Sequence, residues 1–99
     1  MATKMERSSG NVFRDLGFGP QEAENLRLRS ELMIQLRKVI ERRRLTQAGA
    51  AKLFGVTQPR VSDLVRGRIN LFSIDMLVKM LAQAGVQVRL VVKRGRQLA

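Results

Sequence analysis

The apolar positions between residues 20 and 43 repeat with the period of an amphipathic helix. Pro20 suits the first turn of a helix, and Glu22 and Glu24 follow where the helix dipole favours negative charge. Beyond them the apolar residues recur at spacings of seven, three and four, which place them on one face. They are Leu26, Met33, Leu36 and Ile40, with Leu32 and Val39 widening the stripe. The pattern predicts a helix over residues 20–43.

Two short helices are predicted next, each introduced by a threonine that can cap it. Thr46 precedes a helix over residues 47–54 that Gly55 ends, and Thr57 precedes a second helix that ends at Gly67. Small and apolar residues stand where the packing of two crossing helices demands them. They are Ala51 at the crossing and Val56, Val61 and Leu64 on the buried side of the second helix. The stretch therefore predicts helix, short turn, helix.

The last third of the chain changes from a helical period to an alternating one. Ser73 can cap a helix over residues 74–84, and Gly85 suits its end. Residues 86–93 then alternate between apolar and polar side chains, with Val91 as the exception, and this pattern predicts a β-strand. The core is expected to include Phe54, Phe72, Met76 and Met80.

A single strand leaves its backbone N–H and C=O groups unpaired, so the predicted strand needs a partner. The same strand of a second copy is the economical choice and would make a two-fold homodimer joined by an antiparallel pair. The alternative is a pair with the segment around residues 11–13 of its own chain. The side chains predicted to form the dimer contact are Val86, Val88, Leu90 and Val92.

The ends of the chain are predicted to lie outside the folded domain, which we place at residues 11–94. Residues 1–10 are polar and are expected to be a disordered tail, and residues 95–99 a mobile basic tail. Residues 11–19 include four apolar side chains but are broken by two glycines and followed by Pro20. They are expected to dock on the domain as an extended segment or turn.

Composition excludes several functions. The 99 residues allow one domain, and the chain has no His, Cys, Trp or Tyr. Zinc sites, disulfides and Ser–His chemistry are therefore excluded, and we expect no metal, no cofactor and no enzymatic activity. No segment approaches the roughly 18 to 20 apolar residues of a membrane helix, so a cytoplasmic protein is expected.

The net charge of +11 is concentrated in the last two thirds of the chain. Residues 32–99 carry fourteen basic side chains against Glu41, Asp63 and Asp75 only. This excess favours a polyanionic partner. Charge alone leaves open DNA, RNA, the ribosome and an acidic protein. The three arginines at residues 42–44 either face solvent or contact phosphate.

The polar side of the second short helix suits a DNA major groove, where base edges offer hydrogen-bond donors and acceptors. Asp63 would repel phosphate unless it accepts a hydrogen bond from cytosine or braces Arg60 and Arg66 on either side. Arg60 could read guanine or touch phosphate. The predicted base contacts are Gln58, Arg60, Ser62 and Asp63, with Gln58 leading. The predicted phosphate contacts are Thr46, Lys52, Thr57, Arg66 and Arg68. The threonines and the lysine have the alternative of caps or surface, and Arg68 that of a solvated turn, whereas phosphate is favoured for Arg66.

Counted from Gln47, the chain has alanine at the fifth place, glycine at the ninth, and valine and leucine at the fifteenth and eighteenth. This pattern resembles the helix-turn-helix of the XRE family of phage-repressor-like regulators. The resemblance implies an all-α domain of four to five helices, here with one C-terminal β-strand for dimer pairing. It also implies that Gln47 contacts a phosphate and supports Gln58.

The likeness extends to NVFRDLGF near the start, to the sequence from Gln47 through Gly85, and to VQVRL. Together these are similar to the HigA-type antitoxins, over roughly residues 11–92. The resemblance implies a homodimeric repressor of its own operon, bound to a palindromic operator, that also sequesters a RelE- or HigB-like toxin. A solitary or prophage regulator is the alternative. A small basic ribonuclease toxin or a nucleic-acid-binding protein without sequence preference would also fit the size and charge.

Overall fold

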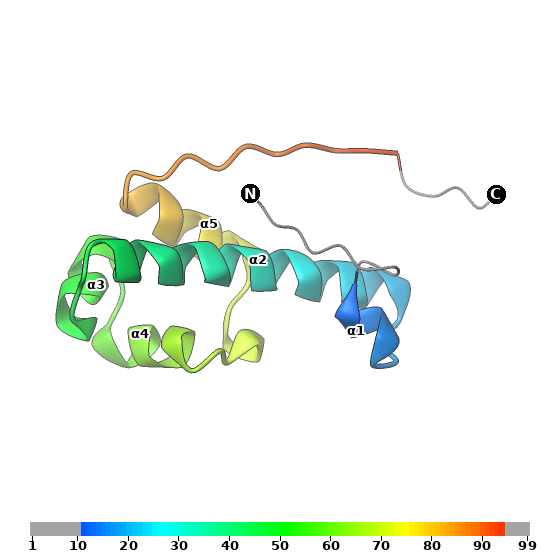
Figure 1. The fold of residues 1–99 in the computed structure, drawn as a ribbon, viewed down its shortest axis with the longest axis horizontal. Helices are drawn as coiled ribbons and strands as arrows, with labels where there is room; N and C mark the ends of the chain where they lie inside the picture. The colour runs from blue at the N-terminus through cyan, green and yellow to red at the C-terminus, as the bar shows by residue number, and fades with distance from the viewer. Residues whose placement is uncertain (1–10, 95–99) are drawn as a thin grey trace.

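The computed structural model describes residues 11–94, which form five α-helices and one 3-10 helix. The predicted disordered tail at residues 1–10 and the predicted basic tail at residues 95–99 lie outside the described residues. Figure 1 shows α2 running through the length of the molecule, with α5 on one side and α4 on the other. The elements are α1 (Val12–Asp15), α2 (Pro20–Arg42), α3 (Gln47–Phe54), α4 (Gln58–Val65), η1 (Ile69–Leu71) and α5 (Ile74–Gln83).

The long helix α2 confirms the prediction made from its apolar stripe. Pro20 lies in its first turn, and the buried side chains include Leu26, Met33, Leu36 and Val39. Met33, Leu36 and Val39 belong to the core that α2 shares with the later helices, mainly α5. Burial of such a stripe, rather than intrinsic helix propensity, supplies most of the stability of a helix in a protein.

The predicted caps of the three shorter helices are all confirmed. The Thr46 Oγ1 accepts a hydrogen bond from the Gly49 N–H at 3.0 Å. The Thr57 Oγ1 accepts from the Arg60 N–H at 3.3 Å, and the Ser73 Oγ accepts from the Met76 N–H at 3.1 Å. Each hydroxyl thereby satisfies one of the backbone N–H groups that a helix start leaves without a partner.

The core lies where α2, α3, α4 and α5 meet. Phe54 and Phe72 are almost fully buried, and Met80 is buried beside them, as predicted. Met76 is only half-buried and packs against the edge of the core. The Ala51 predicted at the helix crossing is also half-buried, whereas its neighbour Ala50 has no exposed surface.

The segment at residues 11–19 differs from its prediction, because part of it is helical. Asn11 caps α1, its Oδ1 accepting from the Phe13 N–H at 2.9 Å. Its Nδ2 also donates to the Ala23 carbonyl of α2 at 3.1 Å. The rings of Phe13 and Phe18 meet edge to face at 6.3 Å. A helix of four residues is too short to show a period, so the pattern of apolar residues did not reveal it.

The C-terminal strand is not formed in the single chain. Residues 86–94 have no regular secondary structure and run as an extended segment on the α5 side of the molecule (Figure 1). The alternative partner inside the chain does not exist either, because residues 12–15 are helical. A ladder requires a second extended backbone, and residues 11–94 supply none. Pairing between two copies stays a prediction. No helix within residues 11–94 has the length and apolar character needed to cross a membrane.

Candidate nucleic-acid interface

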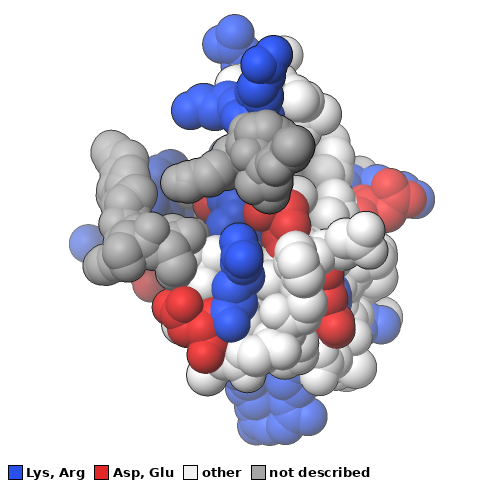
Figure 2. Space-filling view, turned by 90° about the vertical axis from the view of Figure 1, so that its right-hand side faces the viewer, with Lys and Arg blue, Asp and Glu red and all other residues white. Residues whose placement is uncertain are grey.

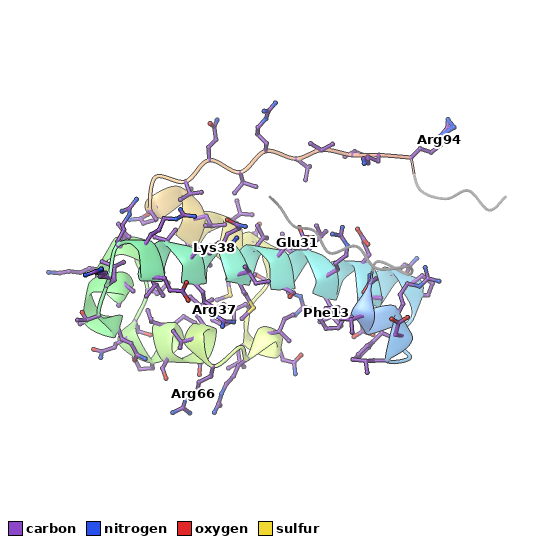
Figure 3. The ribbon with its side chains drawn as sticks, viewed as in Figure 1. Phe13, Glu31, Arg37, Lys38, Arg66 and Arg94 are labelled. Carbon is purple, nitrogen blue, oxygen red and sulfur yellow. The ribbon has the colours of Figure 1, made fainter. Side chains whose placement is uncertain are left out.

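The exposed side of α4 lies on the surface opposite to α5. Val61 and Leu64 anchor α4 in the core, each with no exposed surface. Gln58 is exposed in the first turn, and Arg66 at the C-terminal end points away from α2 (Figure 3). The structure therefore presents a short helix held by one apolar face, with an amide at one end and a guanidinium at the other.

Ser62 and Asp63 lie further along α4 and are only half-buried. The predicted brace between Asp63 and the arginines on either side is not formed, since no ion pair joins them among residues 11–94. The Asp63 backbone carbonyl instead accepts from the Arg68 N–H at 3.0 Å. The carboxylate can thus still accept from a base, and that role stays a prediction.

Arg60 turns back toward its own chain. Its Nη1 donates to the Leu71 carbonyl at 3.1 Å, and its guanidinium lies 5.5 Å from the centre of the Phe72 ring. Both contacts suit a cation, because a carbonyl carries partial negative charge and so does the face of an aromatic ring. In the free chain the Arg60 guanidinium therefore binds the segment after α4. Its predicted base contact stays a prediction.

The residues predicted to touch phosphate are all exposed. They are Thr46, Gln47, Lys52, Thr57, Arg66 and Arg68. In both threonines the oxygen accepts the capping hydrogen bond, which leaves the hydroxyl proton to donate. Gln47 and Gln58 each follow a capping threonine, so the first turns of α3 and α4 present equivalent donor groups.

Arg29 of α2 is a residue that the sequence pattern did not single out. Its Nη1 donates to the carbonyls of Ile69 and Phe72, both at 3.2 Å, and its Nε donates to the Asn25 Oδ1 at 2.7 Å. A signal was present in the sequence. The apolar stripe of α2 skips from Leu26 to Met33, and Arg29 occupies the position between them that faces the same side.

Arg43, one of the three arginines after α2, also serves the fold. Its Nη2 donates to the Ala84 carbonyl at 3.3 Å, at the C-terminal end of α5. A cation at this position satisfies a carbonyl that the helix leaves without a partner and complements the helix dipole. Arg43 is exposed, as predicted for a solvated surface, and it also binds the end of α5, while phosphate contact by the run stays a prediction.

Two helices of eight residues, joined by a three-residue turn, with the second helix polar and outward, define a helix-turn-helix module. Proteins of this class place the second helix in the major groove of DNA.

The chain belongs to the helix-turn-helix domain family, whose model matches residues 12–93. It is similar to a solved structure described as a "Putative XRE Family Transcriptional Regulator". The two chains are 33% identical with a TM-score of 0.71, over 79% of this chain and 91% of that chain. These matches support an XRE-type helix-turn-helix regulator. No curated protein matches the chain.

Proposed function

We propose that this helix-turn-helix protein is a sequence-specific repressor that reads its operator through α4. The observation that carries the proposal is the exposed Gln58 in the first turn of a helix whose opposite face is locked in the core. An amide at this position can pair with the N6 and N7 atoms of adenine. Ser62 and Asp63 are further base contacts in this proposal. Arg60 joins α4 to the segment that follows it, through the Leu71 carbonyl.

Phosphate contacts surround α4 in this proposal and set its register on the duplex. Arg66 and Arg68 lie at its C-terminal end, and Thr57 at its start. Thr46, Gln47 and Lys52 of the preceding helix reach the neighbouring backbone. Such contacts supply affinity but carry no sequence information.

The direct test compares a duplex carrying the upstream region of this chain's own gene with random duplexes of equal length. We expect a preference of at least about a thousandfold at physiological salt, as specific regulators show. Equal affinity for both duplexes, measured by band-shift titration, would leave only a non-specific nucleic-acid-binding protein. RNA cleavage by the purified chain would support the alternative of a ribonuclease.

We further propose that two copies pair through residues 86–92, making a homodimer that binds a palindromic operator. Val88, Leu90 and Val92 are 39%, 81% and 84% exposed in the single chain, an unusual amount of apolar surface for an extended segment. Pairing on this side would leave α4 accessible on the other (Figure 1). Two recognition helices would then lie about 34 Å apart, on successive major grooves.

Leu90→Asp should break this dimer, because the charge would enter the buried face of the strand pair. Val91→Asp is the matched control, since adjacent residues of a strand point to opposite faces. We expect sedimentation to give a monomer for Leu90→Asp and a dimer for Val91→Asp. A Leu90→Asp chain that still sediments as a dimer would contradict the strand model.

We also propose that the protein is an antitoxin and that α1 contributes to toxin binding. Asn11 fixes α1 to α2, yet Val12, Leu16 and Phe18 remain 60%, 68% and 41% exposed. Figure 2 looks at this end of the molecule and shows several Asp and Glu side chains around a central Lys or Arg side chain. An apolar surface beside carboxylates suits a small basic protein such as a RelE- or HigB-like toxin.

The antitoxin proposal is tested by co-expressing the chain with the product of an adjacent small basic reading frame. We expect the chain to relieve growth arrest caused by that product, and Leu16→Asp to abolish the relief while operator binding persists. If the neighbouring product is harmless, or if no such frame adjoins the gene, the chain is a solitary regulator.

A further inference from the structure

The segment between α4 and α5 is held by arginines from two different helices. Arg29 of α2 donates from one nitrogen to the carbonyls of Ile69 and Phe72, at 3.2 Å each. Arg60 of α4 donates to the intervening Leu71 carbonyl at 3.1 Å. Three carbonyls within four residues thus accept from two guanidinium groups. Hydrogen bonds from a charged donor are about twice as strong as neutral ones.

Arg29 is itself oriented for this task. Its Nε donates to the Asn25 Oδ1 at 2.7 Å, one helical turn away, which leaves Nη1 directed at the segment. Arg27, two residues earlier, does nothing comparable. Within residues 11–94 it pairs with Glu24 and Glu31 on the surface of α2, at 2.6 Å each, and its hydrogen bond holds the pKa of Glu24 below the usual value. Two arginines on one helix therefore have separate duties.

The held segment begins beside the proposed DNA contacts. Gly67 ends α4 with a φ of +73°, and the exposed Arg68 follows immediately before η1. The Arg68 N–H donates to Asp63 of α4, and the Arg68 carbonyl accepts from Leu71, each at 3.0 Å. The position of Arg68 relative to α4 thus depends on the same few residues whose carbonyls the two arginines bind.

We propose that Arg29 and Arg60 form a two-arginine clamp that positions Arg68 for a DNA phosphate next to the groove occupied by α4. The proposal rests on the proposed DNA-binding function and adds two positioning residues to it. Neither clamp residue touches phosphate. Their charges hold the segment, and a fixed segment lets the Arg68 guanidinium meet the backbone without first losing conformational freedom.

The test is a double-mutant cycle between Arg29→Gln and Arg68→Ala on the full-length chain, with operator affinity measured over a range of salt concentrations. Arg68→Ala should reduce affinity about tenfold and lower the slope of log K against log salt by about 0.9, the value for one lost phosphate. Arg29→Gln should reproduce both changes. The double variant should lose no more than about twofold beyond Arg68→Ala, since Arg29 acts through Arg68.

Arg27→Gln is the matched control, because it removes the same charge from the same helix two residues away. It should leave affinity within about twofold of the wild type and the salt slope unchanged. Asn25→Ala is a milder variant for use if Arg29→Gln unfolds at the assay temperature, as judged by circular dichroism. It should weaken binding in the wild-type background and have no effect beside Arg68→Ala.

Losses that multiply in the double variant would overturn the clamp, and so would an unchanged salt slope in Arg29→Gln. In either case wild-type binding to the operator would still support the proposed function. If the wild-type chain shows no preference for the operator, the proposed function fails and the clamp fails with it.

Discussion

The helices α3 and α4 are built by the same local rules and yet differ in what they show to solvent. Each has eight residues, each is capped by a threonine, and a glycine with positive φ follows each. Both helices begin with an exposed glutamine, but beyond it the outer face of α3 carries Ala48 and Lys52, whereas α4 presents Ser62 and Asp63. The caps determine where a helix begins, and the side chains on the outer face determine what it can bind.

Removing the core contribution of α3 should have the largest effect. Phe54 is 2% exposed and packs within the central cluster, so Phe54→Ala should lower the free energy of unfolding by about 3 to 5 kcal/mol. Urea titration followed by circular dichroism would measure the change. Val65→Ala is the control, because Val65 of α4 is 43% exposed and its loss should stay within about 0.5 kcal/mol. A similar loss for both variants would mean that α4 is as deeply packed at its outer face as α3 is at Phe54.

The two glutamines that open α3 and α4 should separate affinity from specificity. Gln58→Ala should cost about 1 to 3 kcal/mol on the operator and hardly change binding to random DNA, because only base contacts discriminate. Gln47→Ala should weaken both complexes alike, as expected for a phosphate contact. Parallel band-shift titrations on the two duplexes measure this. If Gln58→Ala weakens both equally, Gln58 is a positioning residue as well.

Alanine substitutions at the glycines that follow the two helices should differ by a smaller amount in their effect on the free energy of unfolding. Gly55 and Gly67 have φ of +72° and +73°, and a side chain costs roughly 1 to 2 kcal/mol in this region. A Cβ at Gly55 would also lie 3.3 Å from the Gln83 Cδ of α5, whereas Gly67 has nothing within 4 Å. Gly55→Ala should therefore lower the free energy of unfolding slightly more than Gly67→Ala does. A larger loss at Gly67, measured by urea titration of both variants, would contradict this reading of the turn.

The bounds of α2 to α5 could be predicted because the signals that set them are local. Pro20, three capping hydroxyls and the glycines after the helices all act within a few residues of the helix ends they mark. The outward residues of α4 followed from the same bounds, since they are what remains once the buried side is assigned.

The parts that the sequence did not predict depend on partners far along the chain. Arg29 binds carbonyls about 40 residues away. The gap in the apolar stripe of α2 marks Arg29 as facing inward, but it does not indicate which distant backbone groups the side chain binds. Arg60 was assigned to the outer face by its position on the helix, but its long side chain bends back to Leu71. The strand predicted at residues 86–93 is not formed in the single chain for a related reason, because its pattern specifies an extended chain and not the presence of a partner.

The packing of α5 along α2 has a consequence for how the chain is made. Leu77, Met80 and Leu81 fill the core beside α2, and α5 ends about 40 residues after α2 does. At a synthesis rate of about 5 to 20 residues per second, α5 is completed roughly 2 to 8 s after α2. Until then the apolar face of α2 lacks its main packing partner. The residues of the helix-turn-helix are synthesised during that interval, before α5 completes the core that holds them. Completion of α5 therefore determines when the helix-turn-helix has the core that holds it.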